Sequence, residues 1–86
     1  MTFYNIKDVT SFMKRVSECQ GGVFSQDTGR DMRPMAEYLL SSGMAVHMNG
    51  IDELNVTVEK HEDAIRLMRY MSEMTSSRSR RALRTA

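Results

Sequence analysis

Three groups of side chains in this 86-residue chain have chemistry suited to a functional site. The first is the run His61-Glu62-Asp63, whose imidazole and carboxylates are all metal-ligand types. Consecutive residues of a helix point about 100° apart, so these three side chains cannot converge on one ion. Glu62 and Asp63 instead suit the positive end of a helix dipole. We therefore expect no metal and no other cofactor.

The second group is Cys19, the only cysteine, which is a candidate nucleophile. It falls in the last turn of a predicted helix, where the dipole disfavours a thiolate, so we interpret it as a half-buried structural residue. Adjacent acids such as Asp52-Glu53 point apart and do not form an acid–base pair. The chain also has no nucleophile elbow and no phosphate-binding glycine loop. These observations favour a non-catalytic protein, and a small enzyme with an unrecognised site stays open as an alternative.

The third group is a cluster of arginines near the end of the sequence: Arg78, Arg80, Arg81 and Arg84. Arginine binds phosphate backbones and acidic protein surfaces. Residues 1–74 hold 8 Lys and Arg against 11 Asp and Glu, a formal charge of −3, whereas residues 75–86 hold four arginines and no acid. A nucleic-acid-binding fold normally carries its positive charge on the folded surface. Nucleic acid is therefore the alternative partner, bound weakly through this segment.

The chain is rich in methionine, with nine residues. Flexible thioether side chains fill small cores and also suit adaptable binding surfaces. Met32 and Met74 fall at the ends of predicted elements, so these two are candidates for an exposed partner-binding patch. The core is expected to hold the methionines on predicted inward faces, which are Met13, Met35, Met68 and Met71.

The apolar spacing predicts where the helices lie. Apolar residues at helical spacing predict a first helix over about 5–19, capped by Asn5 and ended by two glycines. A second helix is predicted over about 33–42, with Pro34 in its first turn. A third begins near His61, with an inward stripe at Ala64, Leu67, Met68 and Met71.

Strands are predicted from alternating apolar residues. Residues 23–25 form a short strand before a turn at Gly29, and residues 44–48 alternate as a second strand. Leu54, Val56 and Val58 lie on the buried side of a third strand. The pair Asn49-Gly50 is a turn signal, so the last two strands are predicted to form a hairpin.

The predicted fold is therefore a small single α+β domain in the order helix-strand-helix-strand-strand-helix, with a mainly antiparallel sheet packed by helices. Residues 1–74 form the compact domain. Residues 75–86 are polar and cationic and are predicted to be a flexible basic tail.

From Val9 to Met71 the chain resembles a group of short proteins from Gram-positive bacteria and their mobile elements, often labelled polyA polymerase. The matching residues are Glu18-Cys19-Gln20-Gly21-Gly22 after the first helix, Gly29-Arg30-Asp31 after the turn, and Glu62-Asp63 at the start of the last helix. The resemblance implies no active site, because this chain lacks the paired metal-binding acids and nucleotide-binding loop of a nucleotidyltransferase.

Together these features favour a small non-catalytic protein-interaction or regulatory module whose partner is another protein. A homodimer stays open. No apolar run approaches the ~18 residues of a membrane span, so no membrane partner is expected. A single cysteine and the absence of a signal-peptide pattern favour the cytoplasm.

Overall fold

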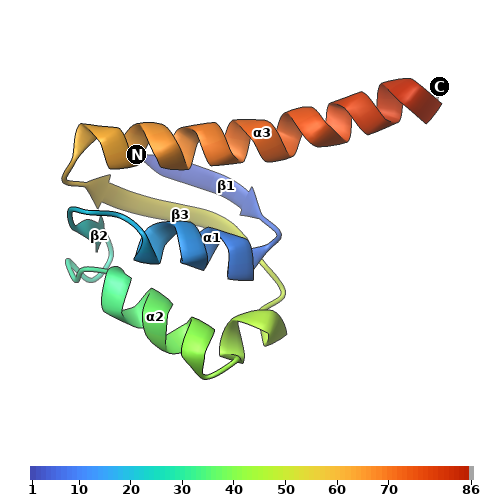
Figure 1. Cartoon of the computed structure of the whole chain (residues 1–86). Helices are drawn as coiled ribbons and strands as arrows, with labels where there is room; N and C mark the ends of the chain where they lie inside the picture. Colours follow the sequence, from blue (N-terminus) through green and yellow to red (C-terminus); the bar gives the residue numbers. More distant parts are fainter. Residues whose placement is uncertain (86) are drawn as a thin grey trace.

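The computed structural model describes the backbone of residues 1–85 and the side chains of residues 1–74. Three strands form one sheet in the order β1-β3-β2: β1 (Thr2–Ile6), β2 (Val23–Ser25) and β3 (Ile51–Val58). Both pairings with β3 are antiparallel, so β1 and β2 run parallel on either side of it (Figure 1). The predicted α+β class and the small antiparallel sheet are confirmed.

Helices cover one face of this sheet. The edge of the Phe3 ring in β1 meets Phe12 of α1 (Val9–Ser17), with 5.5 Å between ring centroids. Phe12 also contacts Tyr70 of α3 (His61–Thr85), at 6.3 Å, so both helices share one core. α2 (Arg33–Ser41) packs against α1 (Figure 1). The other face carries polar side chains such as Glu53 and Thr57 and faces solvent.

The sequence analysis does not predict β1: it assigns residues 2–4 to no element and places Asn5 and Ile6 at the start of the helix predicted over about 5–19. Phe3 and Ile6 are both buried although they are three positions apart, because Asn5 adopts a left-handed backbone with φ 55°. That spacing resembles a helical pattern more than a strand. The helix instead begins at Val9, and Asp8 caps it by accepting a hydrogen bond from the Ser11 amide at 3.0 Å. The predicted capping by Asn5 is wrong.

The strand predicted at 44–48 is also wrong. Residues Met44–His47 form a 3-10 helix, η1, which follows Gly43 in a left-handed conformation with φ 76°. Within η1 it is Ala45 that is buried, while Met44 and Val46 are exposed. The predicted hairpin is therefore absent from the described chain, and β3 pairs with β1 and β2 instead.

The strand-to-helix stretch from β3 into α3 is confirmed in most respects. Val56 is fully buried, and Leu54 and Val58 pack against the core as predicted. Leu67 is buried and Met71 is partly buried. Met68 is exposed, however, because it lies at the margin of the buried face of α3, where it lines a hollow beside β1 instead of entering the core. The prediction that it fills the core is wrong.

Two methionines outside α3 test the same prediction. Met13 is buried in the core as predicted, but Met35 is exposed on α2, so its predicted core position is wrong.

The predicted flexible tail, residues 75–86, lies outside the described side chains and stays a prediction. No helix in the described part of the chain combines the length and apolar character needed to cross a membrane.

Candidate functional site

The structure separates the two methionines that the sequence singled out. Met32 is only 4% exposed and belongs to the core. Its amide donates to the Val23 carbonyl at 2.7 Å, which ties the residue to β2 and turns its side chain inward. The prediction that Met32 contributes to a partner-binding surface is therefore wrong. Met74 is exposed and lines a groove, described below.

The four arginines proposed for partner binding, which are Arg78, Arg80, Arg81 and Arg84, lie outside the described side chains. Their role stays a prediction from the sequence.

Asp31 and Arg33 form the closest ion pair of the described residues. The Arg33 guanidinium lies 2.6 Å from Asp31 Oδ2, and this contact lowers the pKa of the Asp31 carboxyl. Asp31 Oδ1 also accepts from the Val23 amide, and Arg33 donates to the Gln20 carbonyl. These contacts fasten the turn after β2 to the end of α1, so they hold the fold together.

Asp63 is an acid that the sequence analysis assigned only to the helix dipole. It is 1% exposed, and its carboxylate accepts hydrogen bonds from the Gln20 amide at 3.2 Å and the Gly21 amide at 2.8 Å. It therefore joins the start of α3 to the loop between α1 and β2. Among the described residues, no group of three or more His, Cys, Asp and Glu side chains is placed to hold a metal ion.

Cys19 lies beside this junction. Its thiol is buried and donates to the Arg15 carbonyl at 3.4 Å. Burial, and then the nearby negative charge of Asp63, raise the pKa of the Cys19 thiol to about 11. A thiol with this pKa stays protonated at neutral pH and is a poor nucleophile. Cys19 is more buried than the half-buried position predicted, and its structural role stays a prediction.

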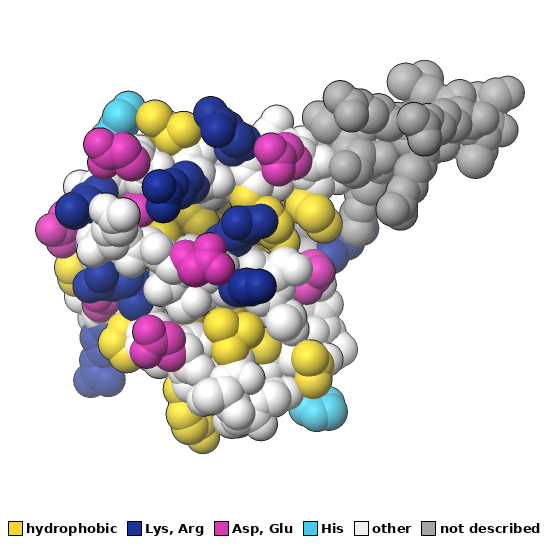
Figure 2. Space-filling model, viewed as in Figure 1, with side chains coloured by type: hydrophobic (Ala, Val, Ile, Leu, Met, Phe, Trp, Pro, Cys, Tyr) yellow, Lys and Arg dark blue, Asp and Glu magenta, His cyan; other side chains and the backbone are white. Residues whose placement is uncertain are grey.

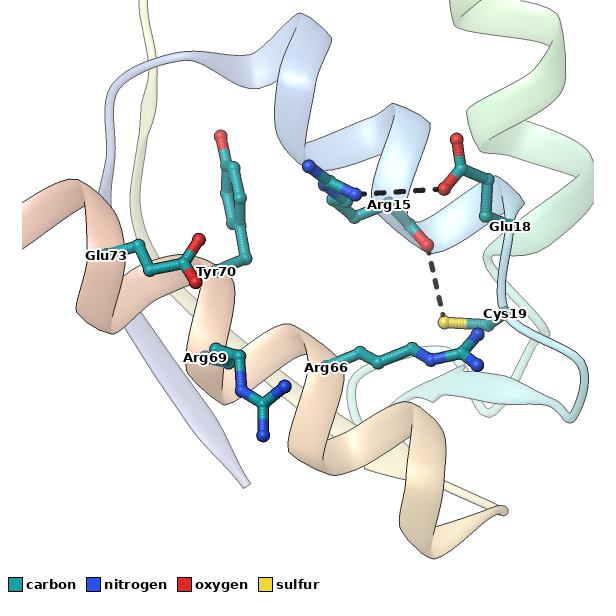
Figure 3. Close-up of a pocket in the computed structure, with 7 residues that line it drawn as sticks. All are labelled: Arg15, Glu18, Cys19, Arg66, Arg69, Tyr70 and Glu73. Atoms are coloured by element: carbon teal, nitrogen blue, oxygen red, sulfur yellow. Dashed lines mark hydrogen bonds and ion pairs between the residues drawn. The ribbon is translucent and has the colours of Figure 1, made fainter.

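A groove of about 200 Å³ runs between α1 and α3, lined by Arg15, Glu18, Cys19, Arg66, Arg69, Tyr70 and Glu73 (Figure 3). Arg15 lies over the Tyr70 ring, 5.6 Å from its centroid, and forms a long, exposed contact of 3.9 Å with Glu18. Arg66 reaches toward Cys19, whereas Arg69 points away from α1 (Figure 3). Cationic and anionic side chains alternate across this face of the molecule (Figure 2). The groove is therefore of mixed charge.

A second groove lies between β1 and α3. It consists of two adjoining hollows of about 430 and 420 Å³, which share Tyr4 and Met71. We call this surface the methionine groove and define it by Tyr4, Met68, Met71 and Met74. Met68 and Met71 line the first hollow, and Met71 and Met74 line the second. Tyr4 and Met68 are 59% and 50% exposed, so solvent reaches much of this apolar surface.

The sequence analysis found one part of the methionine groove and missed the rest. Met74 was identified, but Tyr4 was not, because the sequence analysis assigned residues 1–4 to no element and did not predict β1. Met68 was placed in the core because its position fits the apolar stripe of α3. The sequence signal was Ile65, an extra apolar residue beside this stripe that is exposed in the structure, because it gives α3 more apolar residues than the core requires.

Comparison with known proteins adds no relative: no protein-family model, curated protein or solved structure matches this chain. The resemblance to short proteins of Gram-positive bacteria stays an expectation from the sequence.

Proposed function

We propose that this protein is a small non-catalytic interaction module that binds another protein through the methionine groove. The observation that carries the proposal is the exposure of large apolar side chains, Tyr4, Met68 and Met74, along a hollow between an edge strand and a helix. Exposed apolar surface of this kind marks interaction sites in soluble proteins. Methionine suits such a site because its unbranched, polarizable chain adapts to the shape of the partner.

The reactive groups found in the sequence support a binding role over a chemical one. Cys19 holds its proton at neutral pH, and the carboxylate of Asp63 is occupied by two backbone amides. Asp31 is paired with Arg33. Each of these groups is engaged in a contact that stabilises the fold. We also propose a reducing location such as the cytoplasm, because Cys19 is a free, buried thiol.

The test is affinity capture with the wild-type protein and with Met68→Glu, followed by binding measurements on each purified captured protein. A carboxylate in the methionine groove opposes apolar contact, so we expect Met68→Glu to weaken binding at least ten-fold. The matched control is Met44→Glu, at a methionine of similar exposure, 49%, on η1. Capture that survives Met68→Glu and is lost with Met44→Glu would place the binding surface elsewhere.

A nucleic-acid partner is the second candidate, and the arginines of the α1–α3 groove favour it. Arg15, Arg66 and Arg69 line one hollow, and the sequence carries four more arginines after Met74. Glu18 and Glu73 in the same hollow oppose phosphate binding. We therefore expect weak, salt-dependent binding when labelled duplex DNA or single-stranded RNA is titrated at near-physiological salt. Sub-micromolar, sequence-dependent affinity would favour this candidate over the interaction module.

A further inference from the structure

The outer edge of β1 has unused hydrogen-bonding groups. Met1 and Val56 exchange both backbone hydrogen bonds, each at 2.9 Å. Bonded pairs alternate along an antiparallel ladder, so Phe3 and Leu54 form the next bonded pair. The amide and carbonyl groups of Thr2 and Tyr4 therefore point away from β3. In the described part of the chain, no strand pairs with this side of β1.

The opposite edge of the sheet is protected. The segment after β2 folds back along it, so that Ser25 donates to the Arg30 carbonyl at 2.9 Å and Met32 donates to Val23. Proteins usually protect an open edge with charged side chains, proline or a bulge. Thr2, Phe3 and Tyr4 carry no charge and include no proline. The left-handed Asn5 limits the usable edge to these three residues.

We propose that β1 pairs with β1 of a second copy of this chain, in an antiparallel register with the two-fold axis at Phe3. This register places Thr2 opposite Tyr4 of the other copy. Both residues have outward-pointing amide and carbonyl groups, so each of the two symmetric pairs exchanges two hydrogen bonds. The edge is therefore complementary to itself, and pairing produces one continuous six-stranded sheet.

The same symmetry brings together the exposed side of the two α3 helices. α3 lies next to β1, where Met68 and Met71 line a hollow with residues of that strand. Ile65 and Met68 are exposed one turn apart on this helix. Across the two-fold axis they meet their counterparts in the second copy. Strand pairing and these side chains together form a small interface, so we expect a dimer that dissociates on dilution.

This inference rests on the proposed function, because it names the second copy as the protein that occupies the methionine groove. The test is sedimentation velocity of the full chain over a range of concentrations. We expect a dimer of twice the 9.9 kDa chain mass. Lysine on an edge strand opposes pairing, so Tyr4→Lys is expected to weaken dimerisation at least ten-fold. Tyr38→Lys, at a tyrosine of matched exposure on α2 (62%), leaves it unchanged.

Hydrogen exchange of the Thr2 and Tyr4 amides tests the register directly. These amides exchange rapidly in a monomer and become protected as the dimer forms, and circular dichroism confirms that each variant is folded. A protein that stays monomeric at high concentration, or a dimer that is insensitive to Tyr4→Lys and leaves both amides unprotected, would overturn the inference. If binding of a different protein is still lost with Met68→Glu, the proposed function survives that result.

Discussion

The buried carboxylate of Asp63 offers the sharpest test of how this small fold is held together. Replacement with alanine leaves the Gly21 amide, a buried donor 2.8 Å from Asp63, without its acceptor. An unsatisfied buried donor destabilises a protein by about 1–3 kcal/mol. The Gln20 amide is 3.2 Å away in an exposed residue, so water replaces its acceptor at little loss. We expect Asp63→Ala to lower the free energy of unfolding by about 2–3 kcal/mol.

A loss of this size is large for a domain of this length, whose total stability is about 4–13 kcal/mol. Urea denaturation followed by circular dichroism at neutral pH measures it, and with a slope of about 1 kcal/mol/M the midpoint falls by roughly 2–3 M. Asp63→Asn keeps one oxygen to accept from Gly21, so it is expected to lose about 1 kcal/mol. The neighbouring exposed acid provides the control, Glu62→Ala, with an effect within about 0.5 kcal/mol. If Asp63→Ala is as stable as this control, the junction does not stabilise the fold.

Three further predictions concern the core and its turns. Val56→Asp places an unpaired carboxylate at a fully buried position of the central strand. This lowers the free energy of unfolding by several kcal/mol and is expected to abolish the folded circular dichroism spectrum. A native-like spectrum would contradict the strand register. The pKa of the Cys19 thiol is raised from 9.0 to about 11, so between these pH values the folded state retains a proton that the unfolded state releases. The contribution of this thiol to the free energy of unfolding is therefore fully present below pH 9 and is lost as the pH rises to 11. Cys19→Ala should flatten this fall in urea titrations at several pH values. Gly50→Ala forces a φ of 120° on a residue with a side chain and places its Cβ only 3.0 Å from the Ile6 carbonyl oxygen. We expect this change to destabilise the fold by about 1–3 kcal/mol. An unchanged melting temperature would show that position 50 is not strained by a side chain.

The class of fold and most helices were predictable because their signals are local. The stripe of α1, Pro34 in the first turn of α2 and the alternation of Val56 with its neighbours each depend on residues close in sequence. The N-terminal strand was not predictable in this way. A single left-handed residue, Asn5, changes which side of β1 faces the core. Asparagine is enriched in this conformation, but residue type alone does not identify which asparagine adopts it.

The candidate site was harder to predict for a related reason. Whether a methionine on an amphipathic element is buried depends on what packs against it, and that is a tertiary property. Met32 is buried because its amide is tied to β2, whereas Met68 is exposed because nothing in the described chain covers its side of α3. Both lie in sequence contexts that predicted the opposite outcome.

The order β1-β3-β2 has a consequence for how the chain acquires its structure. The central strand is the last of the three in the sequence, and β1 and β2 contact it but not one another. A nascent chain that ends before Ile51 therefore contains two strands and no sheet. The bond between Met1 and Val56 spans 55 positions, so the first residues must wait for more than half of the chain before they pair. This arrangement favours slow, cooperative folding for a protein of this size. The backbone groups of β1 stay unpaired until β3 has been synthesised.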